Sequence, residues 1–477
     1  MANSRNSSTG KKKEYTIDQV KKKLRPKILM PEDNDNYFKN IIGNKDIVEQ
    51  LTETVELLNS GSEIKILGVD FHPSFVMLGM QGVGKTITTF AFAKEMNLPI
   101  IAINCERIVQ DYSEEMFDGI IKLVESVGKC VVMFKEIQFF ANMKTEDSIP
   151  IYNMILDVKE AFPESFFFVS ASVTTTYPAY FMGEEGFDTM ISFNPPGPED
   201  REALIRKFLE ELPYVENLDI PKLARDFFGF SGGDIKCLLK KAFIQAMVEE
   251  QDELTYEIIN QTMYSDMFGK KISKMSEKEL RFTAYHEAGH VIAGYYALPE
   301  YKVSKVEVAY RSYSLGITDP EVDEKKLSTT KEDLKGEIIH SLGGKCAEQI
   351  IFNTSTSGVM QDLQQATALA DGYVCKFGMD ESFGPVYVDD DEYFSDALKS
   401  IADIKVQELM ISLERQTIDI LREHKDTLIK LAETLAKKET LYKDEIIQIL
   451  EGSKNEPKST KNTKKTKNPP KKAKNPS

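Results

Sequence analysis

The chain of 477 residues lacks any long hydrophobic run. No apolar stretch approaches the roughly 18–20 residues that a membrane-spanning helix needs, so the sequence predicts no integral membrane segment. The first residues, MANSRNSSTGKKKEYTIDQVKKK, are polar and basic and contain no apolar core of a secretory signal. We therefore expect a soluble protein, with two to four domains at roughly 100–200 residues per domain.

Cysteine is scarce and scattered. The five cysteines contain no CxxC pair, and they are Cys105, Cys130, Cys237, Cys346 and Cys375. An odd, unpaired set argues against a disulfide framework and against a zinc site built from cysteine alone. It fits a reducing compartment, so we expect a cytoplasmic protein.

The sequence also predicts no basic folded face. The net charge is −16 although both ends of the chain are rich in lysine, so the part between the ends is acidic. An acidic body with two basic tails is not typical of a general nucleic-acid binder, so no specific nucleic-acid partner is expected. Two interpretations of these basic tails are open. The tails are solvated, disordered ends, or they give weak contact with anionic membrane or RNA.

The body divides by its hydrophobic pattern, and we see no internal repeat. Residues 31–200 alternate helical segments with short apolar runs, which are SFVML (74–78), PIIAI (99–103), CVVMF (130–134) and FFFV (166–169). Such runs predict a parallel sheet covered on both faces. Residues 201–270 read as short helices after the boundary FNPPGPED, and residues 275–452 read as mostly helical with a β-like interruption at 303–318. Residues 1–30 and 453–477 are predicted to be disordered basic ends.

A phosphate-binding loop is predicted at residues 79–86, which read GMQGVGKT after an apolar strand and before a helical pattern. Its glycines let backbone N–H groups turn toward phosphate oxygens. Lys85 would reach the β- and γ-phosphates of ATP, and the Thr86 hydroxyl would bind Mg²⁺. The expected nucleotide-binding residues are Gly79, Gly82, Val83, Gly84, Lys85, Thr86, Ile87 and Glu136.

Glu136 follows the strand CVVMF, where a hydrolysing ATPase places an acidic pair. The first member of that pair is replaced here by Lys135. At ~4 Å and an effective dielectric of ~20, one unit charge pair interacts by about 4 kcal/mol, so a lysine beside Mg²⁺ would be repelled. Lys135 either neutralises phosphate directly or points away.

A metal site is predicted at residues 283–290, which read TAYHEAGH. In a helix, His286 and His290 lie on one face, so both imidazoles can bind one Zn²⁺. Glu287 lies beside them and can act as the general base toward a zinc-bound water. Two of the chain's five histidines fall in this motif, which makes it specific.

Zinc needs a third protein ligand, and spacing alone does not choose it. Asp362, at the start of a helical run, is the best carboxylate, although an acid there is more often a helix N-terminal residue. Zinc is the default for two histidines and a carboxylate, but other divalent ions fit such a set.

The order of these motifs resembles the FtsH-type AAA+ zinc metalloproteases over about residues 37–450. The most specific stretches are AYHEAGH (284–290), LGGKCAEQIIF (342–352), STSGVMQDLQQAT (355–367) and FGMDESFGPV (377–386), and GFSGGDI (229–235) resembles the family's lid signature. The resemblance implies an α/β AAA+ P-loop ATPase domain with a helical lid, followed by a mostly α-helical zinc metallopeptidase domain. It implies His286, His290 and Asp362 as zinc ligands and Glu287 as the base. It also implies a hexameric ring that threads unfolded protein into a protease chamber.

The chain departs from the family pattern mainly in the motor. It lacks the family's transmembrane segments, so membrane anchoring is not implied. The sensor asparagine position is Ser172, and the segment that supplies arginine fingers reads GEEGFD (183–188). The aromatic pore loop is missing, and Tyr112 is a candidate substitute. An arginine finger is worth about 10³–10⁵ in rate, so its loss predicts impaired hydrolysis.

Three functional hypotheses follow. The first is a zinc metalloendopeptidase that degrades unfolded or misfolded proteins with ATP, as a homo-hexamer. The second keeps the zinc peptidase but has a degenerate nucleotide module that hydrolyses ATP poorly. The third is a regulatory subunit of a mixed ring with homologues. The intact metal motif argues against the third hypothesis.

Overall fold

The computed structural model describes residues 15–452, except 61–71, 111–113, 142, 176, 184–185, 211, 274, 299, 313–314, 321–325, 327 and 390–393. The chain forms two compact units, residues 1–263 and residues 264–477, and each is described by itself. Residues 1–14 of the N-terminal arm and the whole tail from residue 453 lie outside the described residues. Among the described residues, no helix is both long and apolar enough to cross a bilayer.

The N-terminal unit is built on a six-stranded sheet with the order β1-β3-β4-β5-β2-β6. The strands are β1 (Lys27–Leu29), β2 (Phe75–Leu78), β3 (Ile100–Asn104), β4 (Val131–Lys135), β5 (Phe166–Ala171) and β6 (Thr189–Ser192). All neighbours pair in parallel except β1, which runs antiparallel to β3. The predicted parallel sheet and its four apolar strands are thus confirmed, and β1 and β6 are additions.

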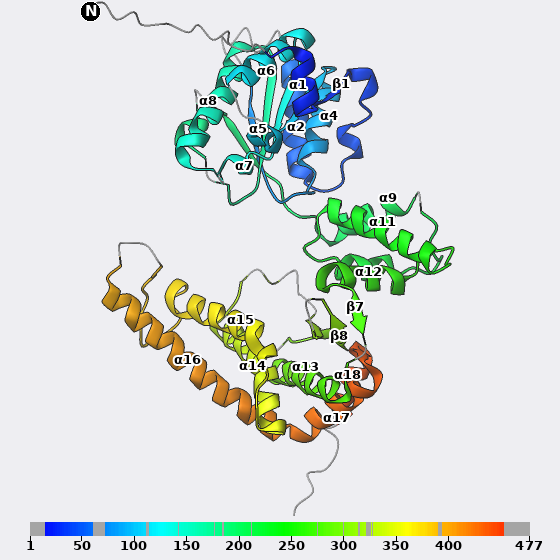
Figure 1. Ribbon diagram of the computed structural model, residues 1–477, viewed down its shortest axis with the longest axis vertical. Helices are drawn as coiled ribbons and strands as arrows, with labels where there is room; N and C mark the ends of the chain where they lie inside the picture. Colours follow the sequence, from blue (N-terminus) through cyan, green and yellow to red (C-terminus); the bar gives the residue numbers. More distant parts are fainter. Residues whose placement is uncertain are drawn as a thin grey trace, which may run out of the picture. The chain divides into compact units, whose positions relative to one another are not determined.

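Helices cover both faces of this sheet (Figure 1). They are α1 (Ile17–Leu24), α2 (Lys45–Asn59), α4 (Lys85–Glu95), α5 (Cys105–Gln110), α6 (Glu114–Val127), α7 (Gln138–Ala141) and α8 (Thr145–Ala161). Alternate residues of β4 point to opposite faces. Val132 and Phe134 pack in the core that includes α6 and α8, whereas Val131 and Met133 pack in the core that includes α2 and α4. The apolar runs are continuous because each strand is buried on both sides.

The prediction of a disordered arm over residues 1–30 is wrong for its second half. Helix α1 begins with a capping box in which Thr16 and Gln19 exchange hydrogen bonds. Val20 and Leu24 are buried against the core that includes α6. The two apolar residues lie four apart on one helix face, and the lysines between them point outward, so the charge run concealed an amphipathic helix.

Four helices complete the N-terminal unit and match the predicted run of short helices. They are α9 (Pro198–Leu209), α10 (Ile220–Asp226), α11 (Gly232–Val248) and α12 (Tyr256–Phe268). The predicted boundary FNPPGPED ends with Pro198 at the first position of α9. The last helix, α12, spans residues 263 and 264, where the two compact units divide.

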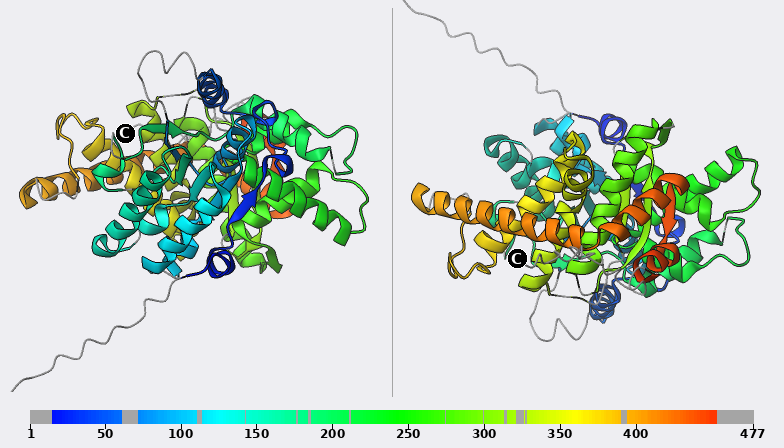
Figure 2. Two further views of the ribbon diagram at one scale, coloured as in Figure 1. Left: turned by 90° about the horizontal axis from the view of Figure 1, so that it is seen from above. Right: turned by 90° about the horizontal axis from the view of Figure 1, so that it is seen from below.

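The C-terminal unit is mostly helical, as predicted. Its helices are α13 (Glu277–Ala297), α14 (Lys331–Phe352), α15 (Met360–Asp371), α16 (Asp396–Glu423), α17 (Lys425–Lys438) and α18 (Lys443–Gly452). Its strands are β7 (Lys271–Ser273), β8 (Val303–Val308), β9 (Tyr310–Arg311), β10 (Gly316–Pro320) and β11 (Thr440–Tyr442). Strand β8 lies between β10 and β11, and both pairings are antiparallel. The long helix α16 runs beside α14, as Figure 2 shows in orange and yellow.

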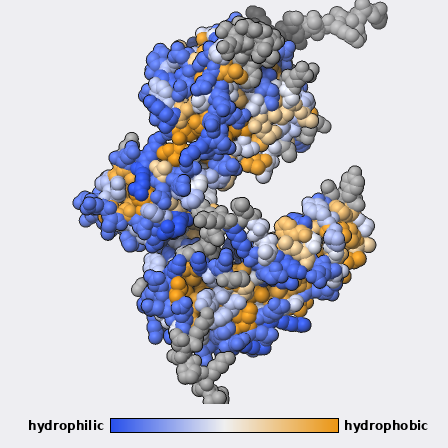
Figure 3. All heavy atoms as spheres, turned by 180° about the vertical axis from the view of Figure 1, so that it is seen from behind, coloured by the Kyte–Doolittle hydropathy of each residue, from blue (hydrophilic) through white to orange (hydrophobic). Residues whose placement is uncertain are grey.

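Apolar side chains of both units gather inside. The core of the C-terminal unit is formed by α13, α14, α16, α17 and the sheet around β8. Figure 3 shows a face that is largely hydrophilic, with separate apolar areas. This distribution is the one expected when the apolar faces of amphipathic helices are buried against one another.

Helices α13 and α14 cross at glycines. A Cβ on Gly343 would lie 2.5 Å from the carbonyl oxygen of Gly289, and a Cβ on Gly344 would lie 2.5 Å from the His286 ring. The two backbones are therefore closer than any residue with a side chain allows at these positions. The close crossing therefore sets the distance between the side chains of α13 and the side chains of α14 that face them.

We predict that Gly343→Ala destabilises the C-terminal unit by about 1–3 kcal/mol, the usual cost of overpacking. The helix-propensity gain from glycine to alanine, about 0.5–1 kcal/mol, is smaller and does not offset the clash. Urea unfolding followed by circular dichroism measures the effect, since the chain has no tryptophan. Gly452→Ala is the control, because a Cβ there meets no atom within 4 Å. Equal stability of the two variants would contradict the prediction.

Candidate metal centre and nucleotide loop

The HExxH residues lie in the middle of α13. The helix begins at a Ser276 cap, whose hydroxyl accepts from the Glu279 backbone N–H. One helical turn separates His286 from His290, and their Nε2 atoms are 3.1 Å apart. Both rings are largely buried. The predicted histidine pair is therefore brought together as the helical spacing requires.

Asp362 reaches the same point from the first turn of α15. Its Oδ2 lies 3.0 Å from His286 Nε2 and 3.4 Å from His290 Nε2. Three ligand atoms around a tetrahedral zinc at ~2.0–2.1 Å are about 3.3 Å from one another. Among the described residues, these three form the group of histidine, cysteine and acidic side chains close enough to share a metal ion. The distances therefore fit zinc, and the ligand assignment itself stays a prediction.

The other ring nitrogens show which atoms face the centre. His286 Nδ1 lies 2.8 Å from Glu348 Oε1, and His290 Nδ1 lies 2.8 Å from the His340 carbonyl oxygen. A carbonyl only accepts, so His290 donates through Nδ1 and turns the Nε2 lone pair inward. The same arrangement with Glu348 holds for neutral His286. Two lone pairs and a carboxylate thus converge, and a positive charge is needed between them.

The pKa shifts agree with this requirement. Burial lowers the pKa of His286, but the hydrogen bonds to Asp362 and Glu348 outweigh burial and raise that pKa to about 10. Burial raises the pKa of Asp362, yet its bonds to His286 and His290 reverse this and hold the pKa well below its usual range. The site therefore favours positive charge, as a proton or as a metal ion.

Glu348 was not identified by the sequence analysis, although it lies in the stretch LGGKCAEQIIF. It is 2% exposed. Besides His286 Nδ1, it accepts from the Thr356 backbone N–H at 2.6 Å and from the Thr356 hydroxyl at 3.1 Å. A carboxylate behind a metal-binding histidine fixes the ring orientation and increases its basicity. His340 packs against His290, with ring centroids 5.4 Å apart.

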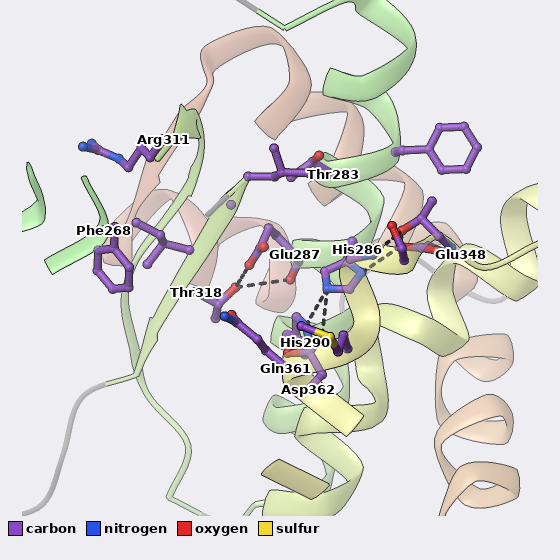
Figure 4. Close-up of a pocket in the computed structure, with 18 of the residues that line it drawn as sticks. Phe268, Thr283, His286, Glu287, His290, Arg311, Thr318, Glu348, Gln361 and Asp362 are labelled. Carbon is purple, nitrogen blue, oxygen red and sulfur yellow. Dashed lines mark hydrogen bonds and ion pairs between the residues drawn. The ribbon is translucent and has the colours of Figure 1, made fainter. Parts of the chain in front are cut away.

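A cavity of about 680 Å³ surrounds these residues. Strand β10 forms one wall, and α13 and the start of α15 form another (Figure 4). Glu287 is 7% exposed, and its carboxylate lies between the histidine pair and β10. Its Oε2 accepts a hydrogen bond of 2.7 Å from the Thr318 hydroxyl. The site thus combines a metal-fitting triad, a neighbouring carboxylate and room for a substrate.

The phosphate loop lies between β2 and α4 in the N-terminal unit, as predicted. Gly79, Gly82 and Gly84 all have positive φ, at 149°, 84° and 108°, which explains the three glycines. Lys85 begins α4, and its ammonium donates to the carbonyls of Gly79 and Met80. Burial lowers the pKa of Lys85 to about 8, and Glu136 opposes the shift.

The remaining predicted nucleotide residues lie around this loop. Val83 is buried, Thr86 is half-buried and Ile87 is 43% exposed in the first turn of α4. Glu136 comes directly after β4, and its φ of 65° turns the chain there while its N–H donates to the Ser170 hydroxyl. The Glu136 carboxylate acts on Lys85 by opposing the lowering of its pKa.

Three of the positions that depart from the family's motor pattern, Lys135, Ser172 and Gly186, lie in the described residues. Lys135 is the last residue of β4 and is half-buried. The Ser172 hydroxyl is hydrogen-bonded to Thr175. Gly186 lies in a tight turn against the carbonyl oxygens of Tyr180 and Phe181. Glu184, Glu185 and Tyr112 lie outside the described residues.

Comparison with known proteins agrees with these two sites. Residues 273–449 match the family described as peptidase family M41. Residues 75–182 match the ATPase family associated with various cellular activities, AAA. The chain is similar to ATP-dependent zinc metalloprotease FtsH of Thermus thermophilus, with 28% identity over 87% of this chain and 70% of the relative. It is similar to FtsH 1 of Conexibacter woesei, with 26% identity over 88% of this chain and 68% of the relative. For FtsH 11 of Arabidopsis thaliana, the identity is 27% over 93% of this chain and 56% of the relative.

Fold and site together define a P-loop ATPase module followed by a two-histidine metallopeptidase domain. The expected fold class is confirmed, and the order of the modules matches that of the resemblance. Over most of its length the chain is similar to the FtsH-type AAA+ zinc metalloproteases.

We predict that Glu348→Ala weakens zinc binding by about 10–100-fold, because His286 loses the partner that fixes its tautomer and orientation. Competition with a chromogenic chelator measures the zinc affinity. Glu332→Ala, at an exposed position in the first turn of the same helix, serves as the control and should bind zinc normally. Wild-type zinc affinity in Glu348→Ala would show that the carboxylate does not support the ligand.

Proposed function

We propose that this protein is a zinc metalloendopeptidase that degrades unfolded or misfolded proteins with ATP. The observation that carries the proposal is the convergence of His286, His290 and Asp362 at distances suited to zinc, beside Glu287 in an open cavity. The phosphate loop of the same chain supports the use of ATP and Mg²⁺. The cofactors are therefore Zn²⁺, ATP and Mg²⁺.

The residues of the site have separate tasks in peptide hydrolysis. Zinc, when bound, supplies Lewis-acid activation of a water molecule and of the scissile carbonyl. Glu287 would accept the proton of the attacking water and return it to the leaving amine, as a general base and then acid. Glu348 and the His340 carbonyl hold the two imidazoles in position through their Nδ1 atoms.

The substrate chain has a natural place at the edge of β10. In the described part of the chain, β10 pairs with β8 on one side and with no strand on the other. An extended peptide can add to such an edge through backbone hydrogen bonds, which suits substrates of varied sequence. The residues Leu315 to Thr318 line the cavity, so a strand added there would pass the proposed metal centre.

The ATP-coupled function is favoured over the hydrolysis-poor module and over the regulatory subunit. The similar proteins are named ATP-dependent zinc metalloproteases, and the metal-fitting triad argues against a regulatory role. Lys135 and the missing arginine fingers still predict slower hydrolysis than in an ordinary unfoldase motor. Steady-state ATPase measurement of the purified protein tests this point.

The partners follow from the family. We propose unfolded proteins as substrates and a homo-hexameric ring as the assembly, with a mixed ring of homologues as the alternative. All five cysteines are unpaired, which supports a reducing, cytoplasmic location. We also propose weak contact of the basic ends with anionic membrane.

We predict that Glu287→Gln abolishes casein degradation, with a loss of at least about 100-fold, because the amide cannot accept the water proton. Degradation is followed by release of acid-soluble label at saturating ATP, and zinc content is measured in the same sample. Full zinc occupancy with no degradation is the expected result. Substantial degradation by Glu287→Gln, or absence of stoichiometric metal from the wild type, would contradict the proposed function.

We predict that Lys85→Ala removes ATP-dependent casein degradation but retains hydrolysis of a short unstructured peptide. The ammonium would no longer reach the β- and γ-phosphates, whereas the peptidase site lies in the other unit. Parallel assays with casein and a fluorogenic peptide measure both activities. An unchanged casein rate would show that nucleotide binding at this loop is not needed for degradation.

A further inference from the structure

The carboxylate of Glu287 is held by strand β10 from across the cavity. The Thr318 hydroxyl donates to Glu287 Oε2 at 2.7 Å, whereas the backbone carbonyl of Glu287 is much farther from that hydroxyl, at 3.5 Å. A Cβ on Gly316 would lie 2.6 Å from Glu287 Cγ and 2.7 Å from Cδ. Two positions of one strand, two residues apart, therefore meet the same side chain. Figure 4 shows Thr318 facing Glu287.

The strand presents both positions because side chains alternate along it. Gly316 and Thr318 are two residues apart and lie on one face of β10, while Ile317 between them is buried on the other face. Pairing with β8, at Gly316 opposite Val308 and Thr318 opposite Val306, fixes this register. A shift of one residue would place Ile317 or Asp319 where Thr318 lies.

A glutamate has several rotatable bonds, and a general base works only when its oxygen lies close to the proton that it accepts. The Thr318 hydroxyl engages Oε2. The absence of a side chain at Gly316 leaves the space that the carboxylate occupies. We propose that Thr318 is the positioning residue of the general base, and that Gly316 is required for the same orientation. This inference rests on the proposed peptidase function.

The role of Thr318 is separable from substrate binding. The strand edge that would receive a peptide is made of backbone groups, which a side-chain substitution on the inward face leaves in place. Removing the hydroxyl while keeping the shape of the side chain should therefore lower kcat and leave KM nearly unchanged.

The test compares Thr318→Val with Thr318→Ser in the full-length protein, using a fluorogenic peptide at saturating ATP. We expect Thr318→Val to lower kcat by about 10–100-fold, as a misplaced catalytic group does, with KM within about 2-fold. Thr318→Ser keeps the donor and should recover kcat to within about 3-fold of the wild type. Gly316→Ala should lower kcat because its methyl group displaces the carboxylate. Thr367→Val is the matched control, since Thr367 is exposed on α15.

Each outcome has one meaning. Normal kcat in Thr318→Val, a loss carried by KM alone, or equal loss in the serine and valine variants would overturn the positioning role. Loss of zinc from Thr318→Val, measured by metal analysis, would overturn it as well, because the effect would then act through the metal site. A wild type without peptidase activity, or an active Glu287→Gln, would instead refute the proposed function itself.

Discussion

The structure of the C-terminal unit depends on one electrostatic requirement. His286 Nε2, His290 Nε2 and Asp362 Oδ2 meet within 3.4 Å, and all three are acceptors when the imidazoles are neutral. Such a group repels itself unless a cation lies between its members. The orientation of each imidazole is fixed from behind, by a carboxylate in one case and a main-chain carbonyl in the other. The protein thus holds three acceptor atoms in a group that a positive charge between them stabilises.

Close packing makes this arrangement possible. The carbonyl of His340 and the carboxylate of Glu348 come from α14, whereas the imidazoles come from α13. These groups reach hydrogen-bond distance because the helices cross at Gly289 and Gly343, where neither side chain separates the backbones. Cores at native packing density transmit small displacements rather than absorb them. The glycines of the crossing therefore help to determine the geometry of the candidate metal site.

How far the sequence predicts the site depends on the distance along the chain. His286, Glu287 and His290 were predicted because one helical turn determines their geometry. Asp362 needed the family resemblance, since nothing local joins it to α13. Glu348 and Thr318 were missed, because their partners are determined by the helix crossing and by the register of β10. No pattern within either segment indicates these contacts.

The same distinction explains the fold. The apolar strands of the N-terminal sheet were predicted because each is buried on both faces and reads as a continuous run. Strand β1 and helix α1 were missed because they lie at the edge, where a few buried residues among many lysines decide the structure. In α16, Ile401 and Ile404 are about half exposed, whereas Leu413 and Leu421 are buried. Hydrophobic spacing indicates a helix more reliably than it indicates which face is covered.

The two cation sites expected in this chain differ in how the protein supplies charge. At the metal centre, acidic and neutral acceptors converge and the positive charge is to be provided by the ion. At the nucleotide loop, Lys85 brings positive charge itself, Lys135 replaces the first acid of the predicted pair, and Glu136 is the acid that remains. Mg²⁺ retains several waters and needs few protein ligands when phosphates are present. Binding of Mg²⁺ at this loop would therefore depend chiefly on Thr86 and on the phosphates of the nucleotide. The loss of one carboxylate would then lower the rate of ATP hydrolysis more than the affinity for ATP.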